Sequence, residues 1–187
     1  MTAALAVASL VFTGGCIACL VHLHLAPTGY SPVRNAVSEY GVGAYARWYR
    51  AQATCSGAAG LLLAGALAKS VHPTPRRVVA LLVVLAAARV AIGWFPTDPL
   101  GTTAPTRNGG IHLLLAAAAF TSASWAAIAL RHPQHGQPAL GWAMAICAIG
   151  TGLALRRSPL KPWLGLIERG YYLAMLAWLV LVAGRLA

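Results

Sequence analysis

The sequence predicts an all-α polytopic membrane protein, a bundle of six transmembrane helices with a short interfacial helix in the first loop. Of its 187 residues, 59% are hydrophobic and only 9% are charged, and the mean hydropathy is +0.69. An ordinary soluble domain has about 25% charged residues, so this chain has too few polar side chains to cover its surface in water. We therefore expect a multi-pass protein of the cell membrane, surrounded by lipid.

Six apolar runs are long enough to cross a bilayer, which takes about 20 helical residues. The runs are 3–25, 48–71, 77–96, 109–130, 139–155 and 163–186. Prolines and glycines, which end or start helices, lie between them. Because the loops are short and no linker separates the runs, residues 1–187 are expected to form a single transmembrane domain.

The first two runs have the features of helices that stay in the membrane and pack closely. Residues 3–25 lack a basic start and a convincing cleavage site, so we expect a retained helix rather than a signal peptide. Cys16 and Cys19 form a C-x-x-C inside this apolar helix, where buried fillers are a better interpretation than a redox pair. In the second run, Gly57 and Gly60 allow a neighbouring helix to approach.

The loop after the first run contains the signals of a short helix. Ser31 is a typical N-cap, and Pro32 and Gly41 are typical of the first helical position and of the stop. We expect residues 32–40 to form an interfacial or re-entrant helix with one apolar side. Helical spacing places its polar side chains on neighbouring positions, where they can cap a polar cavity. These side chains are Asn35, Ser38 and Glu39.

The third run, 77–96, ends in aromatic residues that precede an acid. Trp94 and Phe95 come just before Pro96, and Asp98 follows directly. A carboxyl in such partly dry surroundings is expected to have a raised pKa, which would suit a general acid. The alternative is that Asp98 caps the following turn.

Two further runs carry ionisable side chains. Arg89, near the middle of the third run, would be costly unpaired, so it should face the bundle interior and meet carbonyl groups or a carboxylate such as Glu168. Glu168, Tyr172 and Met175 recur at helical spacing in the sixth run and predict one polar stripe. The alternative is that the tyrosines form an interfacial aromatic belt.

A metal or cofactor is not expected. His112 lies in the first turn of the fourth run, where a lone histidine is more often a hydrogen-bonding residue than a ligand. His22, His24 and His112 with one carboxylate would be the ligand set, but the chain lacks H-E-x-x-H or a similar spacing.

The three acids of the chain, Glu39, Asp98 and Glu168, should all reach the same membrane face if there are six crossings. The same face would hold further polar side chains: His22, His24, Arg107, His112 and Arg169. Ionisable groups in a membrane are costly and mark functional sites, which favours a shared site. The alternative is that each acid only neutralises a nearby arginine.

The formal net charge of +11 does not indicate a nucleic-acid partner. The fourteen lysines and arginines are scattered among loop ends and do not gather on one soluble face. At headgroup depth they would favour anionic lipids. They divide too evenly between the two faces to assign an orientation.

The polar motifs resemble a bacterial membrane family known as domain of unknown function nine hundred and ninety-eight, over nearly the whole chain. The motifs are the run 35–41, the turn 95–98, the helix start 107–112 and the pair Glu168 and Arg169. The resemblance implies a compact multi-helix membrane protein and brings no established activity. It implies that the family's polar positions are Ser38, Glu39, Asp98, His112, Glu168 and Arg169.

These patterns favour two functions about equally. The first is an intramembrane lyase or isomerase that performs acid–base isomerisation or cyclisation on a lipid or isoprenoid, with Asp98, Glu39 and Glu168 as catalytic residues. The second is a binder, transporter or accessory subunit for a lipid or small amphiphile, without catalysis. A structural role and a homo-oligomer stay open. The predicted substrate-binding residues are Asn35, Ser38, Trp94, Phe95, Arg107, His112, Arg169 and Tyr172.

Overall fold

The computed structural model describes residues 1–71, 74–99, 102–130, 137–156 and 159–187. This part of the chain is helical and holds no strand, which confirms the all-α prediction. The α-helices are α1 (Thr2–Leu25), α2 (Ala46–Ala68), α3 (Arg76–Ile92), α4 (Arg107–Ala129), α5 (Pro138–Leu155) and α6 (Leu164–Gly184). Two short 3-10 helices are η1 (Val37–Gly41) and η2 (Lys161–Trp163).

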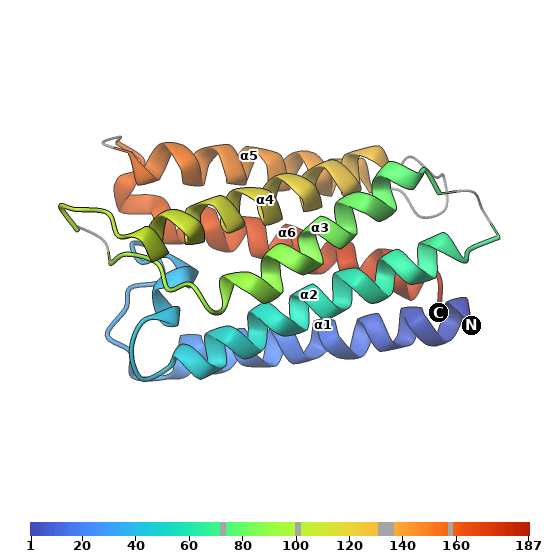
Figure 1. The fold of residues 1–187 in the computed structure, drawn as a ribbon, viewed down its shortest axis with the longest axis horizontal. Coiled ribbons are helices and arrows are strands. Elements are labelled where there is room, and N and C mark those ends of the chain that lie inside the picture. The colour runs from blue at the N-terminus through green and yellow to red at the C-terminus, as the bar shows by residue number, and fades with distance from the viewer. Residues whose placement is uncertain (72–73, 100–101, 131–136, 157–158) are drawn as a thin grey trace.

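The six α-helices pack side by side as a ring. Each helix contacts the next one along the chain, and α1 also contacts α6, which closes the ring. Successive helices run in opposite directions, so both chain ends lie at the same end of the bundle (Figure 1). The loop with η1, the turn after α3 and the first turns of α4 and α6 all lie at the other end. The topology therefore brings the three acids to one end of the molecule.

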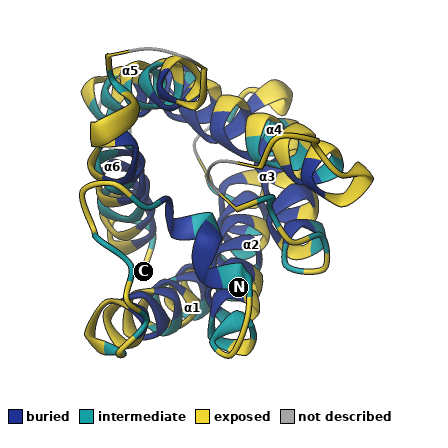
Figure 2. Cartoon of the chain, turned by 90° about the vertical axis from the view of Figure 1, so that its left-hand side faces the viewer, coloured by how far each residue is buried: buried dark blue, intermediate teal, exposed yellow. Residues whose placement is uncertain are grey.

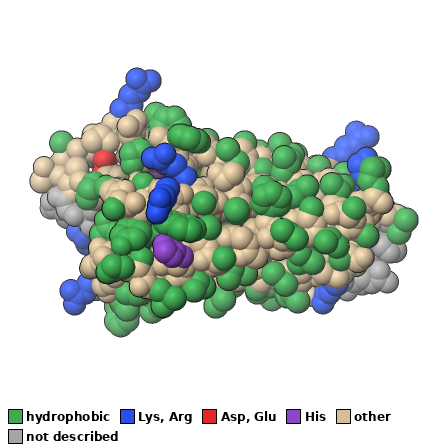
Figure 3. Space-filling model, turned by 90° about the horizontal axis from the view of Figure 1, so that it is seen from below, with side chains coloured by type: hydrophobic (Ala, Val, Ile, Leu, Met, Phe, Trp, Pro, Cys, Tyr) green, Lys and Arg blue, Asp and Glu red, His purple; other side chains and the backbone are tan. Residues whose placement is uncertain are grey.

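Apolar side chains cover the outside of this ring. Val11, Ile146 and Leu173 are each about two-thirds exposed or more, at 67%, 68% and 72%. The view along the bundle shows exposed residues on the outward sides of the helices (Figure 2). One long face is largely apolar between basic side chains toward its two ends (Figure 3). Such a surface matches the hydrocarbon core and headgroup levels of a bilayer.

Among the described residues, five helices are long and apolar enough to cross a membrane: α1, α2, α4, α5 and the stretch Lys161–Gly184 that contains α6. The third helix is shorter than expected, because α3 has 17 residues and ends at Ile92 rather than at residue 96. The amides of Trp94 and Phe95 donate to carbonyls three residues back, as the last turn tightens. Pro96 explains this end, since proline disfavours helix at the residue before it.

Small residues bring the helices close, as the sequence predicts. A side chain at Gly57 would meet the Ala86 carbonyl oxygen of α3 at 2.9 Å. One at Gly60 would meet Leu85, also on α3, at 3.2 Å. Cys16 and Cys19 are free and buried within α1, in agreement with their role as fillers.

The helix predicted for residues 32–40 is wrong in its extent. The chain forms a turn in which the Asn35 amide donates to the Ser31 carbonyl at 2.8 Å, and the 3-10 helix η1 begins only at Val37. Between them Ala36 is extended, with φ −63° and ψ 151°. Two carboxylates cause the break, because the amides of Ala36 and Val37 donate to acidic side chains instead of to helix carbonyls.

Candidate functional site

The 31–41 loop is fastened across one end of the bundle by two carboxylates. Glu39 Oε2 accepts hydrogen bonds from the Ala36 amide at 2.8 Å and from Asn35 Nδ2 at 3.0 Å. Glu168 Oε2, from α6, accepts the Val37 amide at 2.8 Å. Glu39 and Glu168 are both 5% exposed. The loop is therefore tied to α6 through its backbone, and Asn35 and Glu39 serve its conformation.

Arg169 ties the same loop to α1 and α6. Its guanidinium donates to the Asn35 carbonyl at 2.8 Å, to the Tyr40 hydroxyl at 3.2 Å and to His24 Nε2 at 2.6 Å. Because arginine can only donate, His24 must accept at Nε2 and carry its proton on Nδ1, which lies 2.6 Å from the Leu20 carbonyl oxygen. Arg169 thus joins three parts of the chain.

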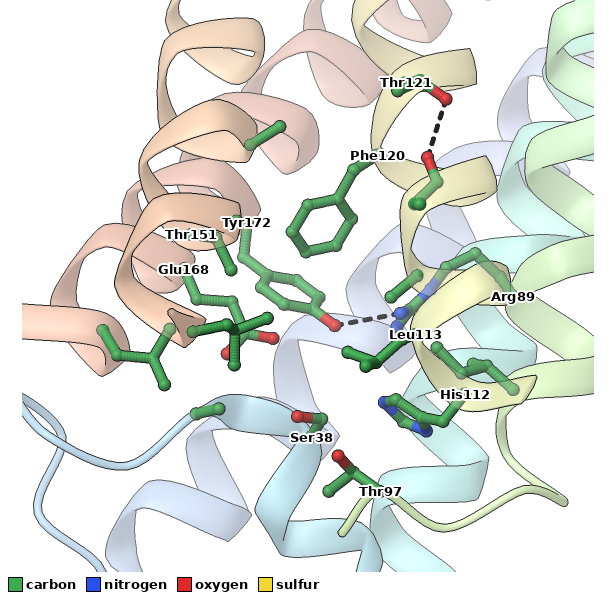
Figure 4. Close-up of a pocket in the computed structure, with 18 of the residues that line it drawn as sticks. Ser38, Arg89, Thr97, His112, Leu113, Phe120, Thr121, Thr151, Glu168 and Tyr172 are labelled. Carbon is green, nitrogen blue, oxygen red and sulfur yellow. Dashed lines mark hydrogen bonds between the residues drawn. The ribbon is translucent and has the colours of Figure 1, made fainter. Parts of the chain in front are cut away.

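A cavity of about 250 Å³ lies beneath this loop, between α3, α4, α5 and α6. Figure 4 shows the side chains that point into it. Its polar end is lined by Ser38, Arg89, Thr97, His112, Glu168 and Tyr172. Its apolar part is lined mainly by α4 and α5 residues, among them Leu113, Ala117, Phe120, Ile149, Gly152 and Leu155. The cavity is therefore amphipathic.

The apolar part opens on the outer surface between α4 and α5. Leu113 on α4 is 49% exposed although it lines the cavity, and Ile149 on α5 is 65% exposed. Gly152 lies at the same mouth, and a side chain built there would meet no atom within 4 Å. The mouth therefore lies on the side of the bundle rather than at its end, where a surrounding bilayer would place lipid.

Arg89 is the buried cation of the polar end. It is 2% exposed and donates from Nε to Ser56 Oγ at 2.8 Å, from one terminal nitrogen to Tyr172 Oη at 2.9 Å and from the other to Gln52 Oε1 at 3.0 Å. These acceptors are all neutral. The predicted direct partner Glu168 is wrong, since within the described residues Arg89 forms no ion pair.

Glu168 and His112 retain unused atoms toward the cavity. The structure gives Glu168 a single hydrogen bond, from Val37 to Oε2, so Oε1 keeps its accepting capacity. His112 lies 2.7 Å through Nδ1 from the Phe95 carbonyl oxygen, which fixes the proton on that nitrogen. Its Nε2 has no hydrogen-bond partner among the residues described. A carboxylate and a basic nitrogen thus line one hollow, and Tyr172 lies nearby (Figure 4).

Asp98 lies outside the cavity lining and has a different environment from the expected one. Its carboxylate accepts the Thr106 hydroxyl at 2.7 Å and the Thr106 amide at 2.9 Å. These bonds, the hydroxyl first, lower the pKa of Asp98, so the predicted raised pKa is wrong. Thr106 in turn caps α4 by accepting the Gly109 amide at 3.0 Å. The alternative of a capping role is the one that the geometry supports.

The remaining predicted contact residues divide between the cavity and the surface. Ser38, His112 and Tyr172 line the cavity. Trp94 is 68% exposed, and the Arg50 guanidinium lies 5.2 Å from its ring, so Trp94 is not a cavity wall. Phe95 contributes its carbonyl to His112, and Arg107 is exposed.

Other lining residues were not predicted to belong to the site. Arg89 had a signal, because a mid-helix arginine in an apolar run is unusual. Tyr49, Thr97 and Thr151 line the cavity as well, and nothing in their local sequence distinguishes them from packing or interfacial residues.

His22, His24 and His112, the histidines of the ligand set considered from the sequence, make separate contacts. His22 packs against the ring of Trp48, with centroids 4.2 Å apart, while His24 and His112 bond to Arg169 and Phe95 respectively. Within the described ranges no group of three histidine, cysteine or acidic residues is placed to hold an ion.

A comparison with models of known protein families gives a match. The model of a family described as "Protein of unknown function (DUF998)" matches residues 6–185. Neither a curated protein nor a solved structure matches the chain.

Proposed function

The chain belongs to this family of unknown function, as its polar motifs predict. From the cavity we propose that the protein binds a membrane amphiphile, with the headgroup at the polar end and the tail between α4 and α5. The observation that carries the proposal is the lateral mouth. Exposed apolar residues of α4 and α5 lead directly to buried Arg89, His112 and Glu168. A water-soluble ligand would have no need of such an opening.

The size of the cavity supports a headgroup rather than a whole lipid. Pockets that enclose a drug-sized ligand hold about 300–1,000 Å³. At about 250 Å³, this cavity is smaller. An amphiphile could therefore place only its polar part inside, and its chains would lie along the outer surfaces of α4 and α5.

The position of the cavity along the bundle also supports binding of a lipid headgroup. Its lining runs from His112 to Thr121 in α4, from Leu164 to Tyr172 in α6 and over the last turns of α3 and α5, so its polar end lies toward one end of the bundle and its apolar part reaches deeper. We count α3 as a sixth crossing because it packs between α2 and α4. Its 17 residues span about 26 Å at about 1.5 Å each, which is close to the thickness of the hydrocarbon core. The polar end then lies at headgroup level, and the 31–41 loop lies at the interface.

Acid–base chemistry on the bound amphiphile is the second candidate. It is favoured by Glu168 and His112, since a carboxylate and a basic nitrogen that face one hollow can move a proton. Asp98 is not included, because its carboxylate is bonded to Thr106 and does not line the cavity. Glu39 is not included, because it holds the loop. The predicted isomerase or cyclase would accordingly rest on Glu168.

The binding proposal can be tested with Gly152→Phe. A ring at this position would fill the mouth, where the added side chain starts in open space. Gly14→Phe is the matched control, because Gly14 is also an exposed helical glycine with open space around it, on α1 away from the cavity. Native mass spectrometry of the purified proteins should show one retained lipid for the wild type and for Gly14→Phe, and at least about tenfold less for Gly152→Phe.

Equal lipid retention by both variants would contradict the proposal. A chemical change of the retained amphiphile that depends on Glu168 would favour the second candidate. It would be detected as a product that accumulates in membranes with the wild type but not with Glu168→Gln.

A further inference from the structure

We propose that the headgroup is zwitterionic, with an acidic group at Arg89 and a primary ammonium at Glu168. This inference rests on the proposed function and names the ligand class for the same cavity. A phosphoethanolamine headgroup has this chemistry, and it differs from choline and from glycerol headgroups in one feature each. Choline has no N–H group to donate, and a glycerol headgroup has no positive charge.

The acidic half of the ligand follows from the state of Arg89. A buried charge is costly unless a charge or several hydrogen bonds compensate it. Arg89 is 2% exposed, and its three hydrogen-bond acceptors, a serine, a tyrosine and a glutamine, are neutral. Because Arg89 also lines the cavity, a phosphate or carboxylate placed there would meet a guanidinium whose charge no described acidic side chain neutralises.

The basic half follows from Glu168. It is 5% exposed, lines the same cavity and accepts one hydrogen bond, from the Val37 amide. A carboxylate offers about four acceptor sites, so most of its capacity is unused. An ammonium with three N–H groups would satisfy it, and a hydroxyl would do so without the charge.

The two charges line one hollow without touching. Within the part of the chain that the structure describes, Arg89 and Glu168 form no ion pair, and Arg89 instead donates to the Tyr172 hydroxyl. That hydroxyl keeps its own hydrogen for another acceptor. Figure 4 shows Glu168 and Arg89 on different walls, with Tyr172 between them and Ser38 below. A ligand with opposite charges a few bonds apart would bridge the gap that the protein leaves open.

The nearby ions do not cancel this pattern. Arg169 and Glu39 lie close to Glu168, but both are bonded to the 31–41 loop and neither lines the cavity. Asp98 is bonded to Thr106. Among the described residues that line the cavity, the acidic and basic side chains are therefore Glu168, Arg89 and the imidazole of His112.

The test compares three phospholipids with identical acyl chains: phosphatidylethanolamine, phosphatidylcholine and phosphatidylglycerol. The full-length protein in detergent is mixed with each, and bound lipid is counted by native mass spectrometry. We expect phosphatidylethanolamine to bind at least about tenfold more tightly than either of the others, because all three share the phosphate and only the ethanolamine ammonium forms a charge-assisted hydrogen bond with Glu168. Glu168→Gln should bind phosphatidylethanolamine and phosphatidylcholine equally. Asp98→Asn, an acid at the same end of the bundle but outside the cavity, should keep the wild-type preference.

The outcomes separate the two proposals. If the three lipids bind the wild type equally and Gly152→Phe still removes them, the zwitterion proposal is wrong and the amphiphile proposal stands. If phosphatidylglycerol binds most tightly, the site recognises only the acidic group of the headgroup, and the zwitterion proposal is also overturned. If no lipid binds through the mouth, both fail. Glycerophosphoethanolamine, which has no acyl chains, is tested last as a competitor of bound phosphatidylethanolamine. If it competes as strongly as the intact lipid does, the headgroup assignment is supported and the proposal that the ligand needs a tail is contradicted. The wild-type comparison holds even if a variant does not fold.

Discussion

Asp98 and Thr106 organise the start of α4 through a short chain of hydrogen bonds. The Thr106 hydroxyl donates to the carboxylate and accepts the Gly109 amide, so the turn after α3 and the cap of α4 depend on one another. Gly109 is required there, because a Cβ atom would overlap the Asp98 carboxylate. The acid singled out as a proton donor thus has a conformational role.

This role predicts a pH dependence. The pKa of Asp98 is lowered in the folded protein, so its contribution to stability is present above the ordinary aspartate pKa and is lost as the pH falls through the lower folded value. In NMR spectra, the Thr106 amide proton should titrate with a midpoint below that of an ordinary aspartate. Asp98→Asn should remove this titration. A midpoint at or above the ordinary value would contradict the assignment.

At the scale of elements, the 31–41 loop has little regular structure and is held instead by side chains. Glu39 bonds it internally, Glu168 bonds it to α6, and Arg169 bonds it to both α1 and α6. Gly165 permits the close approach, because a Cβ atom there would lie 2.6 Å from the Pro32 carbonyl oxygen and closer still to that of Asn35. The loop and the first turn of α6 therefore form one unit that closes the polar end of the cavity.

Gly165→Ala tests this contact. The added methyl group must displace the loop backbone, so we expect a destabilisation of about 1–3 kcal/mol, the range for overpacking a close contact. Thermal unfolding in detergent and limited proteolysis within residues 31–41 would report it. Gly184→Ala is the matched control on the same helix, where an added methyl group meets nothing within 4 Å. Equal melting temperatures for the two variants would show that the contact is not tight.

At the scale of the whole molecule, the ring of helices determines which end of the protein holds the cavity. Small residues allow α2 and α3 to approach, and α1 closes the ring on α6. Both chain ends lie opposite the 31–41 loop (Figure 1). If α3 crosses the membrane as we propose, the polar end of the cavity and the two termini face opposite sides of the bilayer.

Tags on the two termini test the number of crossings. Six crossings place both tags on the same side, so protease added to sealed vesicles should remove both or neither. Removal of one tag alone would indicate an odd number of crossings and would exclude α3 as a span. Detergent-treated vesicles, in which both tags are cut, provide the control for access.

The sequence by itself determined the six long helices, apart from the end of α3, the family and the end of the bundle at which the acids lie, but not the extent of the short helix in the 31–41 loop. Apolar runs, prolines and glycines are local features, and an even number of antiparallel helices follows from counting them. Only the tertiary structure decided which polar groups meet. Arg89 meets Tyr172, Gln52 and Ser56 rather than Glu168, Glu168 meets the Val37 amide, and Asp98 bonds outside the cavity. The reason is that such contacts depend on how each helix is rotated against its neighbours, and packing between distant parts of the chain sets that rotation.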